Sequence, residues 1–151
     1  MKRMISDFKI VLGSCFLSAL TLGSVVESVA AQPNVSEFKR FADWCDRKES
    51  LTPAARHTVE VLLEEAGTQE CEKADETLTN LTALYLGGNQ IADVQPLSAL
   101  TNLTALNLGS NQIADVQPLS ALTNLTALNL GSNPLPDRTC PVHSAISICQ
   151  F

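Results

Sequence analysis

A 22-residue repeat restricts the fold of this 151-residue chain more than any other feature. It runs over residues 78–135, twice in full and once in part. A fixed period of this length predicts a solenoid, in which similar coils stack and each contacts its neighbours. Four sets of residues recur in register: Leu81, Leu103 and Leu125; Leu84, Leu106 and Leu128; Leu86, Leu108 and Leu130; and Asn89, Asn111 and Asn133.

Each repeat predicts one short strand followed by a return limb. The order Leu84, Tyr85, Leu86 alternates apolar, outward and apolar, which is the period of a strand. A single coil cannot bury its leucines alone, so the coils share a core in which each aliphatic side chain contributes roughly 1.5–3 kcal/mol before entropy is subtracted. We therefore expect an α/β solenoid, a short array with a parallel three-stranded sheet.

Polar residues of the repeat fit structural roles better than catalytic ones. Asn89, Asn111 and Asn133 fall where the chain leaves the strand, and their amides suit a ladder that satisfies backbone groups of the turn. Asp93 and Asp115 each precede a proline by three residues, which favours turn capping over metal binding or acid catalysis. A 3₁₀ or α turn is expected over residues 96–100 and 118–122.

The repeat string LTNLTALNLGSNQIADVQPLSAL resembles leucine-rich repeats of the internalin type. Together with a cysteine-bearing helical segment and a short Cys-Pro end, it also resembles small secreted leucine-rich repeat proteins of cyanobacteria. The resemblance covers about 58 residues and implies a concave sheet that holds another protein. This array is shorter than those of internalins, and no cell-wall sorting signal follows it.

Residues 1–31 have the pattern of a secretory signal peptide. Lys2, Arg3 and Lys9 precede a mostly apolar run over residues 10–26, and small residues before Gln32 offer a cleavage site. The alternatives are a retained membrane anchor, for which the run is short, and lipidation at Cys15. We expect cleavage, and so a secreted or periplasmic protein.

Residues 32–77 predict a helical N-terminal cap on the array. A first helix is expected from Ser36 to about Lys48, a second from Thr52 and Pro53 to about Ala66 with Gly67 at its end, and a short turn over residues 70–78. A solenoid needs such a cover for its open core. The apolar side of the first helix comprises Phe38, Phe41, Trp44 and Cys45.

Four cysteines remain after residue 31, an even number in a chain expected to be exported. They allow three connectivities, of which we expect Cys45–Cys71 and Cys140–Cys149 because each pair lies within one cap. Zinc is the competing interpretation, but the spacing lacks C-x-x-C pairs. Residues 136–151 then form a Cys-closed C-terminal cap that covers the last edge of the sheet.

Charge and motifs exclude several classes of function. Residues 32–151 hold fourteen acidic and seven basic residues, and the repeats hold no base, which argues against nucleic acid. His57 and His143 are the two histidines, and no nucleophile motif or phosphate loop is present, so we expect no enzyme, no cofactor and no metal.

A binding module is the expected function, with the concave residues Tyr85, Asn107 and Asn129 as the candidate site and an unknown protein as partner of a monomer. Three short strands offer a flat area on the order of 150 Å², against roughly 800 Å² per partner in a stable interface, so the caps must contribute. Two alternatives stay open. Near-identical repeats also suit an envelope scaffold without a discrete ligand, or binding of a glycan or envelope polymer.

Overall fold

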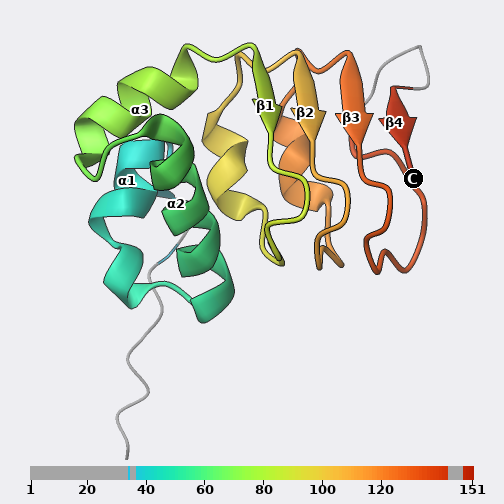
Figure 1. The fold of residues 1–151 in the computed structure, drawn as a ribbon, viewed down its shortest axis with the longest axis horizontal. Helices are drawn as coiled ribbons and strands as arrows, with labels where there is room; N and C mark the ends of the chain where they lie inside the picture. Colours follow the sequence, from blue (N-terminus) through green and yellow to red (C-terminus); the bar gives the residue numbers. More distant parts are fainter. Residues whose placement is uncertain (1–33, 35–36, 143–147) are drawn as a thin grey trace, which may run out of the picture.

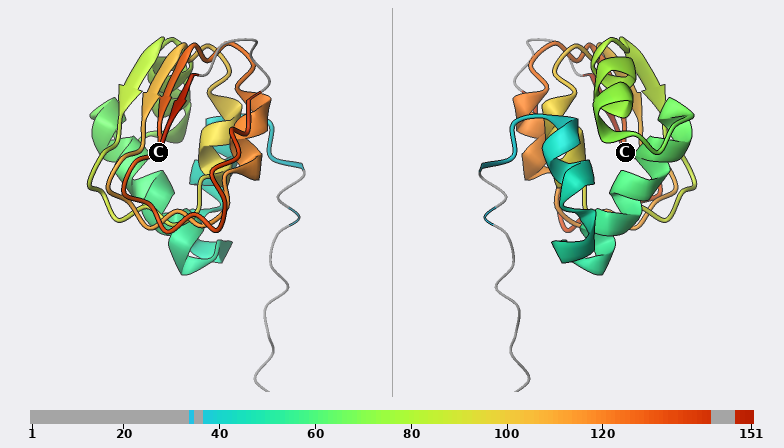
Figure 2. Two further views of the ribbon diagram at one scale, coloured as in Figure 1. Left: turned by 90° about the vertical axis from the view of Figure 1, so that its right-hand side faces the viewer. Right: turned by 90° about the vertical axis from the view of Figure 1, so that its left-hand side faces the viewer.

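The computed structural model describes residue 34, residues 37–142 and residues 148–151. It consists of a helical cap at one end, followed by stacked coils with a parallel sheet on one side and short 3₁₀ helices on the other (Figures 1 and 2). The predicted α/β solenoid with a helical N-terminal cap is confirmed. The predicted leader, residues 1–31, lies outside the described residues, as do Ser36 and His143.

The sheet contains four parallel strands in chain order, β1 (Ala83–Tyr85), β2 (Ala105–Asn107), β3 (Ala127–Asn129) and β4 (Cys149–Gln150). The first three follow the repeat, and their register places each residue beside its equivalent in the next coil, as with Leu84, Leu106 and Leu128. The fourth strand was not among the three predicted. It comes from the chain end and pairs with β3, so the C-terminal cap covers that edge of the third coil by extending the sheet.

The return limbs contain 3₁₀ helices η3 (Gln95–Ala99) and η4 (Gln117–Ala121). The backbone N–H of Gln95 donates to Asp93 Oδ1 at 2.9 Å, and Gln117 N–H donates to Asp115 Oδ1 at 2.8 Å. Asp137 accepts from the N–H of Thr139 in the same way at 3.0 Å. The repeat pattern therefore continues a few residues beyond Leu135. Pro134 and Pro136 stand where the earlier repeats have glutamine and alanine, so the pattern is not apparent from the sequence.

Polar side chains of the repeat bind the coils to one another. Asn111 is buried; its Oδ1 accepts from Ile91 N–H at 3.0 Å, and its Nδ2 donates to the carbonyls of Leu86 and Leu108. Asn133 makes the equivalent contacts one coil later. In the TNLT segments, Asn102 and Asn124 each donate to a backbone carbonyl of the preceding segment. These contacts favour asparagine at the same two positions of successive coils.

The N-terminal cap contains α1 (Phe41–Asp46), the 3₁₀ helix η2 (Lys48–Ser50), α2 (Pro53–Ala66) and α3 (Cys71–Thr79). Helix α2 has the predicted ends: Thr52 Oγ1 accepts from the N–H of Ala55, and Gly67 ends the helix in the left-handed conformation at φ 67°. The first helix is shorter than predicted. Its apolar side is nevertheless buried, and Phe38 packs edge-on against Trp44 with ring centroids 4.8 Å apart.

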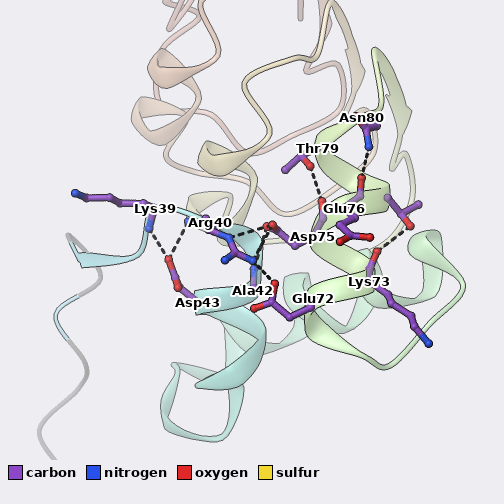
Figure 3. A network of polar contacts seen from close by, with 11 residues as sticks. Lys39, Arg40, Ala42, Asp43, Glu72, Lys73, Asp75, Glu76, Thr79 and Asn80 are labelled. Atoms are coloured by element: carbon purple, nitrogen blue, oxygen red, sulfur yellow. Dashed lines mark hydrogen bonds and ion pairs between the residues drawn. The ribbon is translucent and has the colours of Figure 1, made fainter.

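A polar network fixes where α1 begins (Figure 3). The Asp43 carboxylate accepts from the backbone N–H groups of Arg40 and Lys39, each at 2.9 Å, so the helix starts at Phe41. These hydrogen bonds, that from Arg40 first, hold the pKa of Asp43 below its ordinary value.

The same network joins α1 to α3. The buried carboxylate of Asp75 accepts from Arg40 Nε and from the N–H of Ala42, both at 3.2 Å, and Glu72 pairs with the Arg40 guanidinium. Hydrogen bonds to Glu72 and then Asp75 raise the pKa of Arg40. A disulfide between Cys45 and Cys71 joins the two helices covalently.

Helix α2 docks onto the first coil through two polar contacts. The Nε2 atom of His57 lies 2.7 Å from the backbone oxygen of Asn89, and Thr58 Oγ1 donates to the carbonyl of Asp93 at 2.7 Å. His57 therefore lies at the contact between the helical cap and the first coil.

Within the described residues, no helix is long and apolar enough to cross a membrane.

Candidate functional site

The outer face of the sheet carries one row of larger side chains that crosses the four strands. The strand register places Tyr85 beside Asn107, Asn107 beside Asn129, and Asn129 beside Gln150. Neighbouring strands lie about 4.8 Å apart, so the row is about 14 Å long. Alanine and glycine occupy the outward positions on either side: Ala83, Ala105, Ala127, Gly87, Gly109 and Gly131.

Tyr85 is the most exposed large apolar side chain among the described residues, with 69% of its surface accessible. The helical cap therefore does not cover it. A shallow hollow of about 270 Å³ lies beside it, lined by the residues of the row and by four further residues of β2 and β3: Ala105, Leu106, Ala127 and Leu128. No residue that lines this hollow carries a charge.

The amides of Asn107 and Asn129 have a fixed orientation. Gly109 N–H donates to Asn107 Oδ1 at 3.0 Å, and Gly131 N–H donates to Asn129 Oδ1 at 2.9 Å. A Cβ at Gly109 would lie 3.3 Å from Asn107 Oδ1 and 3.2 Å from Asn129 Nδ2, so the asparagine side chains would have to shift by a few tenths of an ångström to admit it. The two asparagines thus hold the chain turn and also face the hollow.

Gln150 completes the row, and sequence reasoning missed it. Its side chain is exposed on β4, which the disulfide between Cys140 and Cys149 ties to the segment after the third coil. A weak signal was present: Cys149 and Gln150 have the inward–amide order of Leu128 and Asn129, with which they pair. It was not recognised because these two residues lie outside the 22-residue period.

The other candidates from the sequence lie away from this row. Asn111 and Asn133 bond to backbone between the coils, whereas the first-coil Asn89 contributes its backbone oxygen to His57. Asp93 and Asp115 accept hydrogen bonds within their own turns. All four described cysteines are in disulfides, and the described part of the chain contains no group of three metal-ligating side chains.

Comparison with known proteins agrees with the repeat architecture. The family described as Leucine Rich repeats (2 copies) matches residues 79–121 and 101–139. No curated protein sequence matches the chain.

Among solved structures, an internalin from Listeria monocytogenes is 48% identical over 42% of this chain and 19% of its own, with a TM-score of 0.40. Internalin C2 from the same species is 37% identical over 44% of this chain and 31% of its own, also with a TM-score of 0.40. This chain thus spans less than a third of the length of either protein. Its coils are leucine-rich repeats similar to those of internalins, as the sequence predicted.

Proposed function

Because residues 79–139 form an array of leucine-rich repeats, we propose that this protein is an exported, non-catalytic module that holds another protein on the outer face of its sheet. Proteins of this repeat class are typically interaction modules, and the array offers a sheet of parallel strands with one face uncovered. The single observation that carries the proposal is Tyr85, a large aromatic side chain that is 69% exposed beside an uncharged hollow. Tyrosine is enriched among residues that dominate binding energy.

Export is supported by the cysteines. Cys45–Cys71 and Cys140–Cys149 are both disulfides, which form and persist in oxidising compartments. This agrees with the secretory leader expected at residues 1–31. We propose a secreted or periplasmic location on these two grounds.

The row alone is too small for a tight complex. Four short strands present on the order of 200 Å², and a stable interface takes roughly 800 Å² from each partner. The partner therefore also contacts neighbouring surfaces, and Tyr85 acts as the anchor of a weaker, larger contact.

An affinity capture tests this function. The oxidised protein is immobilised and incubated with envelope and secreted fractions of its source organism, beside the variants Tyr85→Glu and Gln117→Glu. Gln117 is exposed on η4, on the opposite layer from the sheet, so it serves as the matched control.

A protein held by the unchanged chain and by Gln117→Glu, but lost by Tyr85→Glu, is the expected result. Equal capture by all three proteins would place the binding site on the caps or on the side of the array that carries the 3₁₀ helices. Capture of nothing would favour the alternative of an envelope scaffold without a discrete ligand.

A further inference from the structure

The row on the outer face presents hydrogen-bond donors. A backbone N–H can only donate, so the contacts from Gly109 and Gly131 turn the Oδ1 atoms of Asn107 and Asn129 toward the backbone and leave the Nδ2 groups for a ligand. Neither Nδ2 donates to any described residue of the chain. Gln150 and the Tyr85 hydroxyl, at the two ends of the row, can each donate as well as accept. The two asparagines in the middle of the row therefore favour a ligand that supplies acceptors.

The residues around the hollow also disfavour a charged ligand. None of the residues around the hollow is ionised at neutral pH, so a charged group brought there would lose its hydration without a counter-charge. A second copy of this face is a poor occupant for a related reason. A two-fold pairing centred on the row would place the Nδ2 donors of Asn107 opposite those of Asn129 and leave acceptors only at its ends, on Tyr85 and Gln150.

A proline-rich segment has the required chemistry. Proline lacks the backbone N–H, so its backbone offers only carbonyl acceptors. Such segments adopt the polyproline II conformation, in which the carbonyls are not bonded within the helix. Proline-rich segments in this conformation dock on exposed aromatic side chains, which here is Tyr85.

The spacing of the row agrees with that conformation. Three residues of a polyproline II helix make one turn and advance about 9.3 Å. Two strand spacings are about 9.6 Å, which is the separation of Tyr85 from Asn129 and of Asn107 from Gln150 in the register. An extended strand repeats its facing groups every 6.6–6.8 Å or so, which matches neither one spacing nor two.

We propose that the outer face binds an uncharged, proline-rich segment of the partner in the polyproline II conformation, running across the four strands. One proline lies on the Tyr85 ring, and carbonyls three residues apart accept from Asn107 and Gln150. The disulfide of Cys149 positions Gln150 for this contact. This inference rests on the proposed function and names the chemistry of the bound segment.

A residue-resolved NMR titration of the oxidised protein tests it. The probe is a decaproline peptide with both ends blocked. A blocked Gly-Ser peptide of equal length is the flexible, uncharged control, and a neutral β-linked glucose hexasaccharide represents the glycan alternative. The variants are Tyr85→Ala, Tyr85→Phe, Gln150→Ala and the control Gln117→Ala, and the spectrum of each variant reports whether it folds.

Decaproline is expected to give saturable shifts at Tyr85, Asn107, Asn129 and Gln150. Tyr85→Ala should weaken binding about tenfold. Gln150→Ala should weaken it by a few fold, as expected for one hydrogen bond. Tyr85→Phe should keep most of the affinity because it keeps the ring, and Gln117→Ala should not change it.

No saturable shifts with decaproline, equal binding of the Gly-Ser peptide, or insensitivity to Tyr85→Ala would overturn the inference. Binding of the hexasaccharide in place of decaproline would assign the face to a glycan and would overturn it as well. A partner captured through Tyr85 while decaproline fails to bind would leave the proposed function standing and reject only the proline-rich segment. Failure of both experiments would reject both.

Discussion

Asn111 and Asn89 occupy the same repeat position but have different surroundings. Replacing each of them in turn therefore distinguishes the stability that comes from the ladder of hydrogen bonds from the stability that comes from the residue type. Asn111 is buried with backbone partners in two coils, whereas Asn89 is half-buried, and no side-chain hydrogen bond joins it to the described residues. Asn111→Ala leaves buried backbone groups without partners and should lower the free energy of unfolding by about 2–3 kcal/mol. Asn89→Ala should cost under about 1 kcal/mol. Urea unfolding measures the free energy of unfolding of both variants. Equal losses in the two would show that burial of the asparagine does not determine its contribution to stability.

Because the pKa of Asp43 is lowered in the folded protein, we expect a small dependence of the protein's stability on pH. Its pKa in the folded protein is lowered by the N–H groups of Arg40 and Lys39, so its contribution is fully present above the unfolded pKa of about 3.9 and is lost as the pH falls through the folded value. Because the carboxylate is partly exposed, the contribution should stay below about 1 kcal/mol. Asp43→Asn should unfold with a weaker pH dependence below pH 5 or so. Identical curves for the two proteins would contradict this assignment.

Helix α2 shows how a single terminal residue sets the end of an element. Gly67 has φ 67°, and a Cβ added there would meet nothing within 4 Å, so a substitution changes backbone strain alone. Gly67→Ala should destabilise the protein by about 1 kcal/mol. Gly67→Asn should cost less because asparagine tolerates this conformation, and Gly67→Val should cost more because it is β-branched. Melting temperatures of the three variants give the order; an order set by side-chain size alone would count against the backbone explanation.

The elements that the sequence predicted well are those whose signals are local. Helix α2 has Thr52 and Pro53 at its start and Gly67 at its end, so both ends are fixed by neighbours in the chain. Helix α1 was predicted too long because Asp43 caps it internally and its contact with Asp75 depends on tertiary packing. Strand β4 and Gln150 were missed for a similar reason. Two residues outside the repeat form a strand only because β3 presents an edge and the disulfide of Cys149 holds them beside it.

At the scale of the whole molecule, the array should accept another coil. The contacts between coils recur with the same spacing from coil to coil, such as Leu106 with Leu128 in the sheet and Asn111 or Asn133 with the coil before it. A duplicate of residues 110–131 placed after Gly131 would therefore repeat the same pattern. Each end cap would keep its own contacts. Nearest-neighbour stabilisation then predicts that the longer protein folds cooperatively and melts at the same temperature or higher.

The matched control is the same insertion with one residue removed between its strand and its turn. That deletion shifts the following leucines out of the inward register and should turn apolar residues toward solvent. Circular dichroism and a thermal melt compare the two proteins. The 22-residue insertion should retain a single transition, while the 21-residue insertion should melt lower by several degrees or lose cooperativity. If both insertions melt alike, the coils are not held in register by the contacts between equivalent residues, and the repeat period would not determine the stability of the array.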